Sequence, residues 1–366
     1  MRVLHVVLDL EAGGLERLVA DMVRRTDRRL FEPHVLALRF LGRHARGLEE
    51  FARLHEGRSR GGWSMLWPRH LSEQIRGIAP QVVHTHSGVW YKASLAARRA
   101  AVPRLVHTDH GRLLPDPWQA RFLDGLAARR TDVVVAVSDV LGQLLARTVV
   151  RDASRIVVVP NGVDTELFWP RPDSGRVRAE LGISGDAPVI GSIGRLDPIK
   201  AYDVMVEAFA RLLAGWGEGP RPVLVLAGNG PEQARLSELV RARSLQGAAR
   251  LLGWRDDVHD LHQAFTLFTM SSRSEGTSLS LLEAMSAGLC PVVTQVGGTP
   301  VVLGDRLRHR MVPAGDPDAL AAAWGAALAD TERRRADALL ARQRVEEAFG
   351  LDAMMRRYQA IYLGER

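Results

Sequence analysis

Ser271-Ser272-Arg273-Ser274-Glu275-Gly276-Thr277-Ser278-Leu279-Ser280-Leu281-Leu282-Glu283-Ala284-Met285 places small polar residues and a glycine directly before an apolar run. This pattern predicts a helix N-terminus, where free backbone N–H groups and the positive end of the helix dipole bind anions such as phosphate. Glu275 falls in the loop and Glu283 in the helix. In one continuous helix the two carboxylates would point about 80° apart and lie roughly 12 Å apart along the axis, too far to share a proton. We interpret them as contacts to different parts of one elongated ligand; the alternative is two solvated carboxylates.

Size and composition narrow the class of protein. A chain of 366 residues exceeds the usual size of one hydrophobic core, which predicts two domains. The formal net charge of +7 comes almost entirely from arginine, since Lys92 and Lys200 are the only lysines. This charge favours an anionic substrate or membrane surface, and without a stacking platform or a helix-turn-helix pattern we expect no nucleic-acid partner. The single cysteine, Cys290, suits a reducing compartment, and the short apolar start resembles neither a signal peptide nor a spanning helix, so we expect a cytoplasmic protein.

Apolar strand-like runs alternate with helical stretches along the whole chain. Such alternation without hairpin signals predicts parallel, doubly wound sheets, in which ligands bind beyond the carboxyl ends of the strands. The predicted strands are 3–8, 33–38, 81–85, 104–107, 132–137, 156–159, 188–193, 223–227, 250–252, 265–270 and 291–294.

Two of the strand exits in the first half carry candidate ligand contacts. Gly13 and Gly14 follow the first strand without the spacing of a dinucleotide fingerprint, so they favour a close approach of a ligand to the backbone, or simply a tight turn. His110, followed by Gly111, is a candidate polar contact, although most single histidines are structural.

The strand exits of the second half carry further candidates. Arg195 and Lys200 lie in one loop and together can neutralise a diphosphate, the alternative being an ordinary first helical turn. Gly228 ends the next strand, and Trp254 with Arg255 follows a third. Trp254 lies either near a nucleotide base or in the core.

Two other segments carry charge patterns with competing explanations. Residues 39–70 combine seven arginines with Phe40, Trp63, Met65, Leu66 and Trp67, which suits the interface of an anionic membrane; the alternative is a solvated loop with tryptophans packed on the core. Asp316-Pro317-Asp318 matches a D-x-D metal signature superficially, but we interpret it as a helix cap.

A stretch rich in proline, glycine and charge at 168–175 predicts the domain boundary. We therefore expect a first domain at 1–165, a linker at 166–186, a second domain at 187–348 and a C-terminal helix at 349–366 that packs back on the first domain.

The motifs together resemble family 4 glycosyltransferases, the retaining nucleotide-sugar transferases of the GT-B fold. The resemblance covers nearly the whole chain and depends on the order and spacing of motifs that are weak singly. They are the Gly-Gly-x-Glu turn at Gly13, Gly14 and Glu16, the Pro-Asn-Gly-Val-Asp exit at 160–164, Gly-Arg-Leu…Lys at 194–200, Ala-Gly-x-Gly-Pro at 227–231, Leu-Gly…Asp-Asp-Val at 252–258, and Glu275 with Glu283.

The resemblance implies two Rossmann-like domains facing across a cleft, with the donor bound mainly by the second. It implies that Arg195 and Lys200 bind the diphosphate, that Glu283 contacts the ribose and that Glu275 and His110 lie at the donor sugar. The donor-side residues it implies are Gly13, Gly14, Arg195, Lys200, Gly228, Trp254, Arg255, Gly276, Thr277, Ser278, Leu279 and Glu283. It implies neither a metal nor a cofactor, since Arg195, Lys200 and the helix dipole supply the positive charge.

The expected activity is retaining transfer of a hexosyl group from a UDP- or GDP-sugar to a lipid-linked or polysaccharide-precursor acceptor. The resemblance extends more loosely to transferases of exopolysaccharide systems, including those with lipid-linked acceptors. Through residues 39–70 we expect peripheral contact with the inner face of the cell membrane. The alternatives are a GT-B relative acting as an epimerase or sugar-phosphate synthase, and a catalytically silent GT-B binding scaffold.

Overall fold

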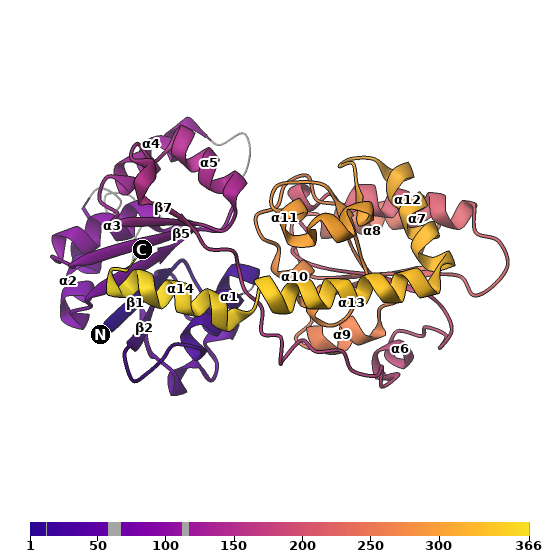
Figure 1. Cartoon of the computed structure of the whole chain (residues 1–366), viewed down its shortest axis with the longest axis horizontal. Helices are drawn as coiled ribbons and strands as arrows, with labels where there is room; N and C mark the ends of the chain where they lie inside the picture. Colours follow the sequence, from indigo (N-terminus) through magenta and orange to yellow (C-terminus); the bar gives the residue numbers. More distant parts are fainter. Residues whose placement is uncertain (12, 58–66, 112–116, 366) are drawn as a thin grey trace. The chain divides into compact units, whose positions relative to one another are not determined.

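The computed structural model describes residues 1–11, 13–57, 67–111 and 117–365 (Figure 1). The chain divides into two compact units, the first made of Met1–Asn161 with Leu351–Arg366 and the second of Gly162–Gly350.

The first unit is built on a parallel sheet that has seven strands within the described ranges. Its order is β3-β2-β1-β4-β5-β6-β7, and His5 of β1 lies opposite His84 of β4 in the register. The strands are β1 (Arg2–Val7), β2 (Glu32–Ala37), β3 (Arg53–Glu56), β4 (Val82–His86), β5 (Arg104–Asp109), β6 (Val133–Ala136) and β7 (Ile156–Val158).

Helices cover both faces of this sheet because alternate strand residues point to opposite sides. Leu4 and Val6 pack with apolar residues of α2 and α3, whereas Val7 packs with α1. The helical segments are α1 (Gly14–Arg24), η1 (Arg43–Ala45), η2 (Leu48–Glu50), α2 (Arg69–Ile78), α3 (Trp90–Arg99), α4 (Trp118–Ala128), α5 (Asp139–Thr148), η4 (Ala153–Arg155) and α14 (Leu351–Leu363).

The second unit, all of whose residues are described, has a six-stranded parallel sheet in the order β10-β9-β8-β11-β12-β13. Its strands are β8 (Val189–Ile193), β9 (Val223–Ala227), β10 (Ala249–Gly253), β11 (Leu267–Met270), β12 (Pro291–Thr294) and β13 (Met311–Val312). Its helical segments are α6 (Arg176–Glu180), η5 (Pro198–Lys200), α7 (Tyr202–Ala214), α8 (Gln233–Ala242), α9 (Val258–Ala264), α10 (Leu279–Ser286), α11 (Thr299–Leu303), η6 (Asp305–Arg310), α12 (Pro317–Ala329) and α13 (Thr331–Ala348).

The predicted fold class is confirmed: each unit is a Rossmann-like parallel sheet with helices, and the C-terminal helix α14, yellow in Figure 1, belongs to the first unit. Asp316 also caps α12 as expected, because its carboxylate accepts the backbone N–H groups of Asp318 and Ala319.

The segment expected to be a linker, 166–186, belongs instead to the second unit. Phe168, Val177 and Ile183 are buried in that unit's core beside α9 and α13, and α6 forms within the segment. Its prolines and glycines shape a packed surface segment whose apolar residues are too widely spaced to show a periodic pattern.

Two strands have no counterpart in the sequence prediction. β3 reads Arg-Leu-His-Glu and lies at the edge of its sheet, and β13 has only two residues. Neither has the apolar run that reveals a buried strand.

In the part of the chain that the structure describes, no helix combines the length and the apolar character needed to cross a bilayer.

Candidate functional site

An ion pair joins two loops at the carboxyl ends of β8 and β11. Lys200 Nζ lies 2.6 Å from Glu275 Oε1, and the side chains are 26% and 7% exposed. The Ser272 hydroxyl donates a 2.5 Å hydrogen bond to the same carboxylate oxygen. The Glu275 carboxylate is therefore held in one position by two donors.

Backbone hydrogen bonds connect the two loops along their length. The Ser271 hydroxyl donates to the carbonyl oxygens of Lys200 (3.0 Å) and Ala201 (2.8 Å). The Arg273 backbone N–H donates to the Ile199 carbonyl at 2.8 Å. These contacts fix the lysine loop on the glutamate loop without the ion pair, so the pair is not needed to hold the backbone.

A glycine pair after β12 supports the glutamate loop from the other side. The Gly298 N–H donates to the Glu275 carbonyl at 3.2 Å, and Gly297 has φ +49°. A Cβ atom on Gly297 would lie 1.8 Å from the Glu275 carbonyl oxygen. Only glycine permits this approach.

We expect Gly297→Ala to destabilise the second unit by about 1–3 kcal/mol, because it adds a backbone clash to a left-handed conformation. The matched control is Gly315→Ala, which has φ +76° but nothing within 4 Å of the added carbon. Urea unfolding of both variants measures the difference. Equal losses would show that the close contact with the Glu275 loop is unimportant.

The helix that follows Glu275 begins with an N-cap whose side chain does not cap it. Ser278 precedes α10, and its hydroxyl contacts Ser280 Oγ (3.2 Å) and Met270 Sδ (3.3 Å) rather than the helix backbone. The first-turn N–H groups of a helix have no intrahelical partner, so this end is suited to an anion. Glu283 lies on the same helix and is 7% exposed.

The chain 271–278 is not helical, so Glu275 lies in the loop and Glu283 in the helix that follows, as the sequence predicts. Thr277 and Ser278 are buried, and Gly276 is half-buried between Glu275 and the helix start. Leu279 is the first residue of α10. Residues 275–279 thus run without interruption from the carboxylate that Lys200 contacts to the start of α10.

The loops after β8, β9 and β10 touch backbone to backbone. Gly228 has φ +139°, and a Cβ there would lie 2.0 Å from the Gly194 carbonyl oxygen. Its N–H donates to the Gly253 carbonyl at 2.7 Å. Gly228 therefore allows the loops after β8, β9 and β10 to pack backbone against backbone. This is a structural role, whether or not a ligand also contacts the residue.

Arg195 shares its loop with Lys200 but has a different environment. Its guanidinium is 67% exposed and lies 2.9 Å from Asp197. The structure shows an accessible cation on the same loop as the ion pair.

Trp254 and Arg255, predicted near the donor, both bond to acidic side chains through their polar groups. Arg255 pairs with Glu180 and Asp257, and its hydrogen bonds hold the pKa of the Asp257 carboxyl well below its usual range. Trp254 Nε1 donates to Asp256 at 2.8 Å. Arg255 therefore has an evident structural role, tying the β10 loop to α6, which the sequence did not reveal.

The remaining predicted residues lie on the first unit. Gly13, with φ +156°, precedes α1, and Gly14 is the first residue of that helix. His110 follows β5, where its backbone N–H donates to the Ser87 hydroxyl oxygen at 2.9 Å, and burial lowers the pKa of its imidazole to about 4.

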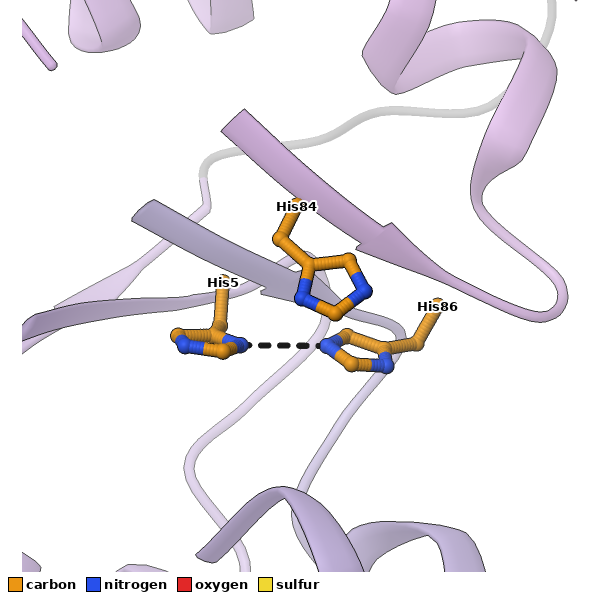
Figure 2. Close-up of side chains that lie close together, drawn as sticks. All are labelled: His5, His84 and His86. Carbon is orange, nitrogen blue, oxygen red and sulfur yellow. Dashed lines mark hydrogen bonds between the residues drawn. The ribbon is translucent and has the colours of Figure 1, made fainter. Parts of the chain in front are cut away.

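Three buried histidines in the first unit were not predicted as site residues. One ring nitrogen from each of His5, His84 and His86 lies within 4.8 Å of the other two (Figure 2). Neutral imidazoles in such a group can bind a transition metal. However, both nitrogens of His84 are already engaged, Nδ1 with the Tyr362 hydroxyl and Nε2 with the Thr108 hydroxyl, each at 2.7 Å.

With two Rossmann-like units, each a parallel sheet with helices, the chain has the architecture of GT-B glycosyltransferases. It matches, over its whole length with a TM-score of 0.86 and 20% identity, the fold of the Anabaena protein HepE, whose structure was solved in complex with UDP-glucose. That likeness covers 100% of both chains.

Family models cover most of the sequence. Residues 12–167 match Glycosyltransferase Family 4, and residues 173–344 match Glycosyl transferases group 1. The chain belongs to glycosyltransferase family 4.

Two curated relatives show the range of chemistry in this family. The alpha-maltose-1-phosphate synthase of Mycolicibacterium smegmatis is 30% identical over 302 residues, which are 74% of this chain and 76% of the relative. The UDP-Gal:alpha-D-GlcNAc-diphosphoundecaprenol alpha-1,3-galactosyltransferase of Escherichia coli is 29% identical over 246 residues, 65% of this chain and 63% of the relative. The chain therefore spans less than two thirds of the second relative's length.

Proposed function

We propose that this glycosyltransferase moves a hexosyl group from a nucleotide sugar, preferably a UDP-hexose, to a lipid-linked glycan precursor with retention of configuration. The observation that carries the proposal is the fixed Lys200–Glu275 pair beside the start of α10, whose N-cap side chain leaves the first-turn N–H groups to a ligand. The E. coli relative, named for a UDP-sugar donor and a diphosphoundecaprenol acceptor, supports the choice of both substrates.

In this proposal the diphosphate of the donor binds the N-terminus of α10, with the Lys200 ammonium and the accessible Arg195 guanidinium as counter-charges. Glu283 contacts the ribose, Glu275 contacts the transferred sugar, and His110 of the first unit contacts the same sugar, as their motif positions imply. Gly14 provides backbone close to the donor. Positive charge fixed before reaction stabilises a leaving group at no cost in reorganisation.

The proposed reaction breaks the bond between the anomeric carbon and the β-phosphate oxygen. The acceptor hydroxyl oxygen bonds to the same face of that carbon, and its proton passes to the departing phosphate oxygen. The protein supplies position and charge, and Glu275 orients the sugar rather than attacking it. Because Lys200, Arg195 and the helix end supply the positive charge, we propose that no metal is required.

Exposed aromatic residues support contact with the membrane that would contain such an acceptor. Phe40 is 45% exposed and Trp67 is 65% exposed, with the Arg99 guanidinium 3.8 Å from the centre of the Trp67 ring. These belong to the region 39–70 proposed to touch an anionic surface; Trp63, Met65 and Leu66 lie outside the described residues. We place the enzyme in the cytoplasm, peripheral on the inner face of the membrane.

The deciding experiment incubates the enzyme with a panel of UDP- and GDP-hexoses and a diphosphate-linked lipid sugar in anionic vesicles. We expect one UDP-hexose to give a glycosylated lipid with the anomeric configuration of the donor, and the enzyme to co-sediment with the vesicles. An inverted product would contradict retention, and turnover without vesicle binding would remove the membrane contact.

A second candidate function is synthesis of a sugar phosphate, favoured by the 30% identity to a maltose-1-phosphate synthase. The same panel with free sugar phosphates as acceptors distinguishes it, because the product would then carry phosphate and no lipid. Epimerisation would give product from donor alone, and a silent scaffold would bind donors without turnover.

A further inference from the structure

Three imidazole rings of the first unit form a hydrogen-bonded series. His5 Nδ1 lies 3.2 Å from His86 Nε2, and His86 Nδ1 lies 3.2 Å from His110 Nε2. Figure 2 shows the first of these contacts, with the nitrogens of His5 and His86 facing each other. The ring planes are 14° apart in the first pair and 28° apart in the second, and the ring centres are 5.5 Å apart in both, which is compatible with in-plane N–H···N bonds.

A fourth ring, His84, lies over this series without joining it. Its centre is 4.2 Å from that of His86, and its two nitrogens contact Tyr362 of α14 and Thr108 of β5. A metal ligand needs a free lone pair directed at the ion, whereas His84 is already bonded through both nitrogens. The arrangement therefore favours a proton-ordered network over a metal centre.

Burial keeps the rings of the series neutral near pH 7. His5 and His86 are at most 1% exposed, and burial lowers the pKa of His5 to about 4 and that of His86 well below its usual value. Burial also lowers the pKa of His110 to about 4. Each neutral ring carries one N–H, on either Nδ1 or Nε2.

Each of the two N···N contacts holds one proton, so the tautomer of one ring determines the tautomers of the other two. If His86 donates from Nδ1 to His110, its Nε2 has to accept from His5 Nδ1, and the His110 proton is then on Nδ1. If His110 donates from Nε2, His86 donates from Nε2 to His5, whose own proton is then also on Nε2. In either case all three rings carry the proton on the same type of nitrogen.

We propose that His5 and His86 are positioning residues that set the tautomer of His110 to match their own. They thereby determine whether His110 Nδ1 offers the donor sugar an N–H or a lone pair. The part that concerns the sugar rests on the proposed function, whereas the coupling of the tautomers does not.

The direct test is nitrogen-15 NMR of imidazole-labelled protein without substrate at pH 7. We expect His5, His86 and His110 each to show one tautomer, the same in all three. Different tautomers among the three rings would overturn the proposal, whatever the enzyme's activity.

Substitution then tests the role of the middle ring. We expect His86→Phe, which keeps a ring but removes both nitrogens, to leave His110 as a mixture of tautomers, and His86→Gln, whose amide can bond on both sides, to restore most of the order. The control is His34→Phe, which breaks a part-buried histidine pair with His55 (3.0 Å) on β2 and β3 and should leave His110 unchanged. An unchanged His110 in His86→Phe would overturn the proposal.

Activity provides the second readout. We expect His86→Phe to lower kcat by roughly two- to tenfold, with a smaller change in KM for the donor. A twofold loss is what an even mixture of active and inactive tautomers would give. If the tautomers are coupled but no donor is turned over by the wild type, the proposed function fails and the coupling stands. If stoichiometric Zn²⁺ shifts the signals of His5, His84 and His86 together, the group is a metal site and the proposal is wrong.

Discussion

Lys200→Ala and Glu275→Ala will each lower turnover by about 10²–10³-fold, the loss typical when one fixed electrostatic contact to a reacting group is removed. In the lysine variant the diphosphate loses a counter-charge and the Glu275 carboxylate, 7% exposed, keeps only the Ser272 hydroxyl as a side-chain donor among the contacts described. In the glutamate variant the ammonium loses the partner that holds it. Steady-state rates with the preferred donor measure both effects, and circular dichroism checks that the fold remains.

The double variant Lys200→Ala/Glu275→Ala tests whether the two residues act together or contribute independently. Because each residue positions the other, we expect the combined loss to be much smaller than the product of the single losses. The control is Arg308→Ala, which breaks an exposed pair with Asp305 in the same unit and should leave turnover unchanged. Wild-type rates in either single variant would refute the site assignment.

Acidification from about pH 6.5 to pH 4 will strongly destabilise the first unit. Burial lowers the pKa of His5 to about 4, from an ordinary value of 6.5, and lowers those of His84 and His86 well below it. Over this range the unfolded chain binds protons that the folded unit does not, so the free energy of unfolding falls as the pH falls. His5 alone contributes roughly 3 kcal/mol to this loss.

Urea unfolding at a series of pH values measures the effect, with His5→Phe as the test variant. A buried phenyl ring cannot take up a proton, so the slope between pH 6.5 and pH 4 should become shallower. His70→Ala is the control, since His70 is 82% exposed. Carboxylates whose pKa is held below its usual range, such as Asp257 and Glu32, begin to lose their stabilising effect only at the acidic end of this window, so the slope between pH 6.5 and pH 5 reports mainly the histidines. The same slope in His5→Phe and wild type would show that His5 is protonated in the folded unit.

Local sequence patterns were enough to predict the two parallel sheets and the loops that carry the candidate site. Buried parallel strands are continuous apolar runs, and a lysine at position 200 of a chain with only two lysines drew attention to its loop. The Lys200–Glu275 contact itself joins residues 75 positions apart, so the sequence supplied the two residues but not their pairing.

Other features depend on contacts that no local pattern contains. The histidine series requires the register of β1 against β4 and of β4 against β5, which places His5, His86 and His110 in reach of one another. The role of Arg255 depends on Glu180, 75 residues away in a segment expected to be a linker. β3 is an exposed edge strand with charged residues, for which periodicity gives no signal.

The division of the chain sets the order in which its parts can fold during synthesis. The second unit is continuous, and its ends meet where the Val163 N–H donates to the Phe349 carbonyl at 2.9 Å. The first unit is interrupted: Tyr358 and Tyr362, which contact Thr108 and His84, are translated only after the whole second unit. During synthesis the second unit can therefore fold before the first unit is complete. Until α14 is made, the buried histidines of the first unit lack the tyrosines that cover them, and exposed core surface of this kind is bound by chaperones.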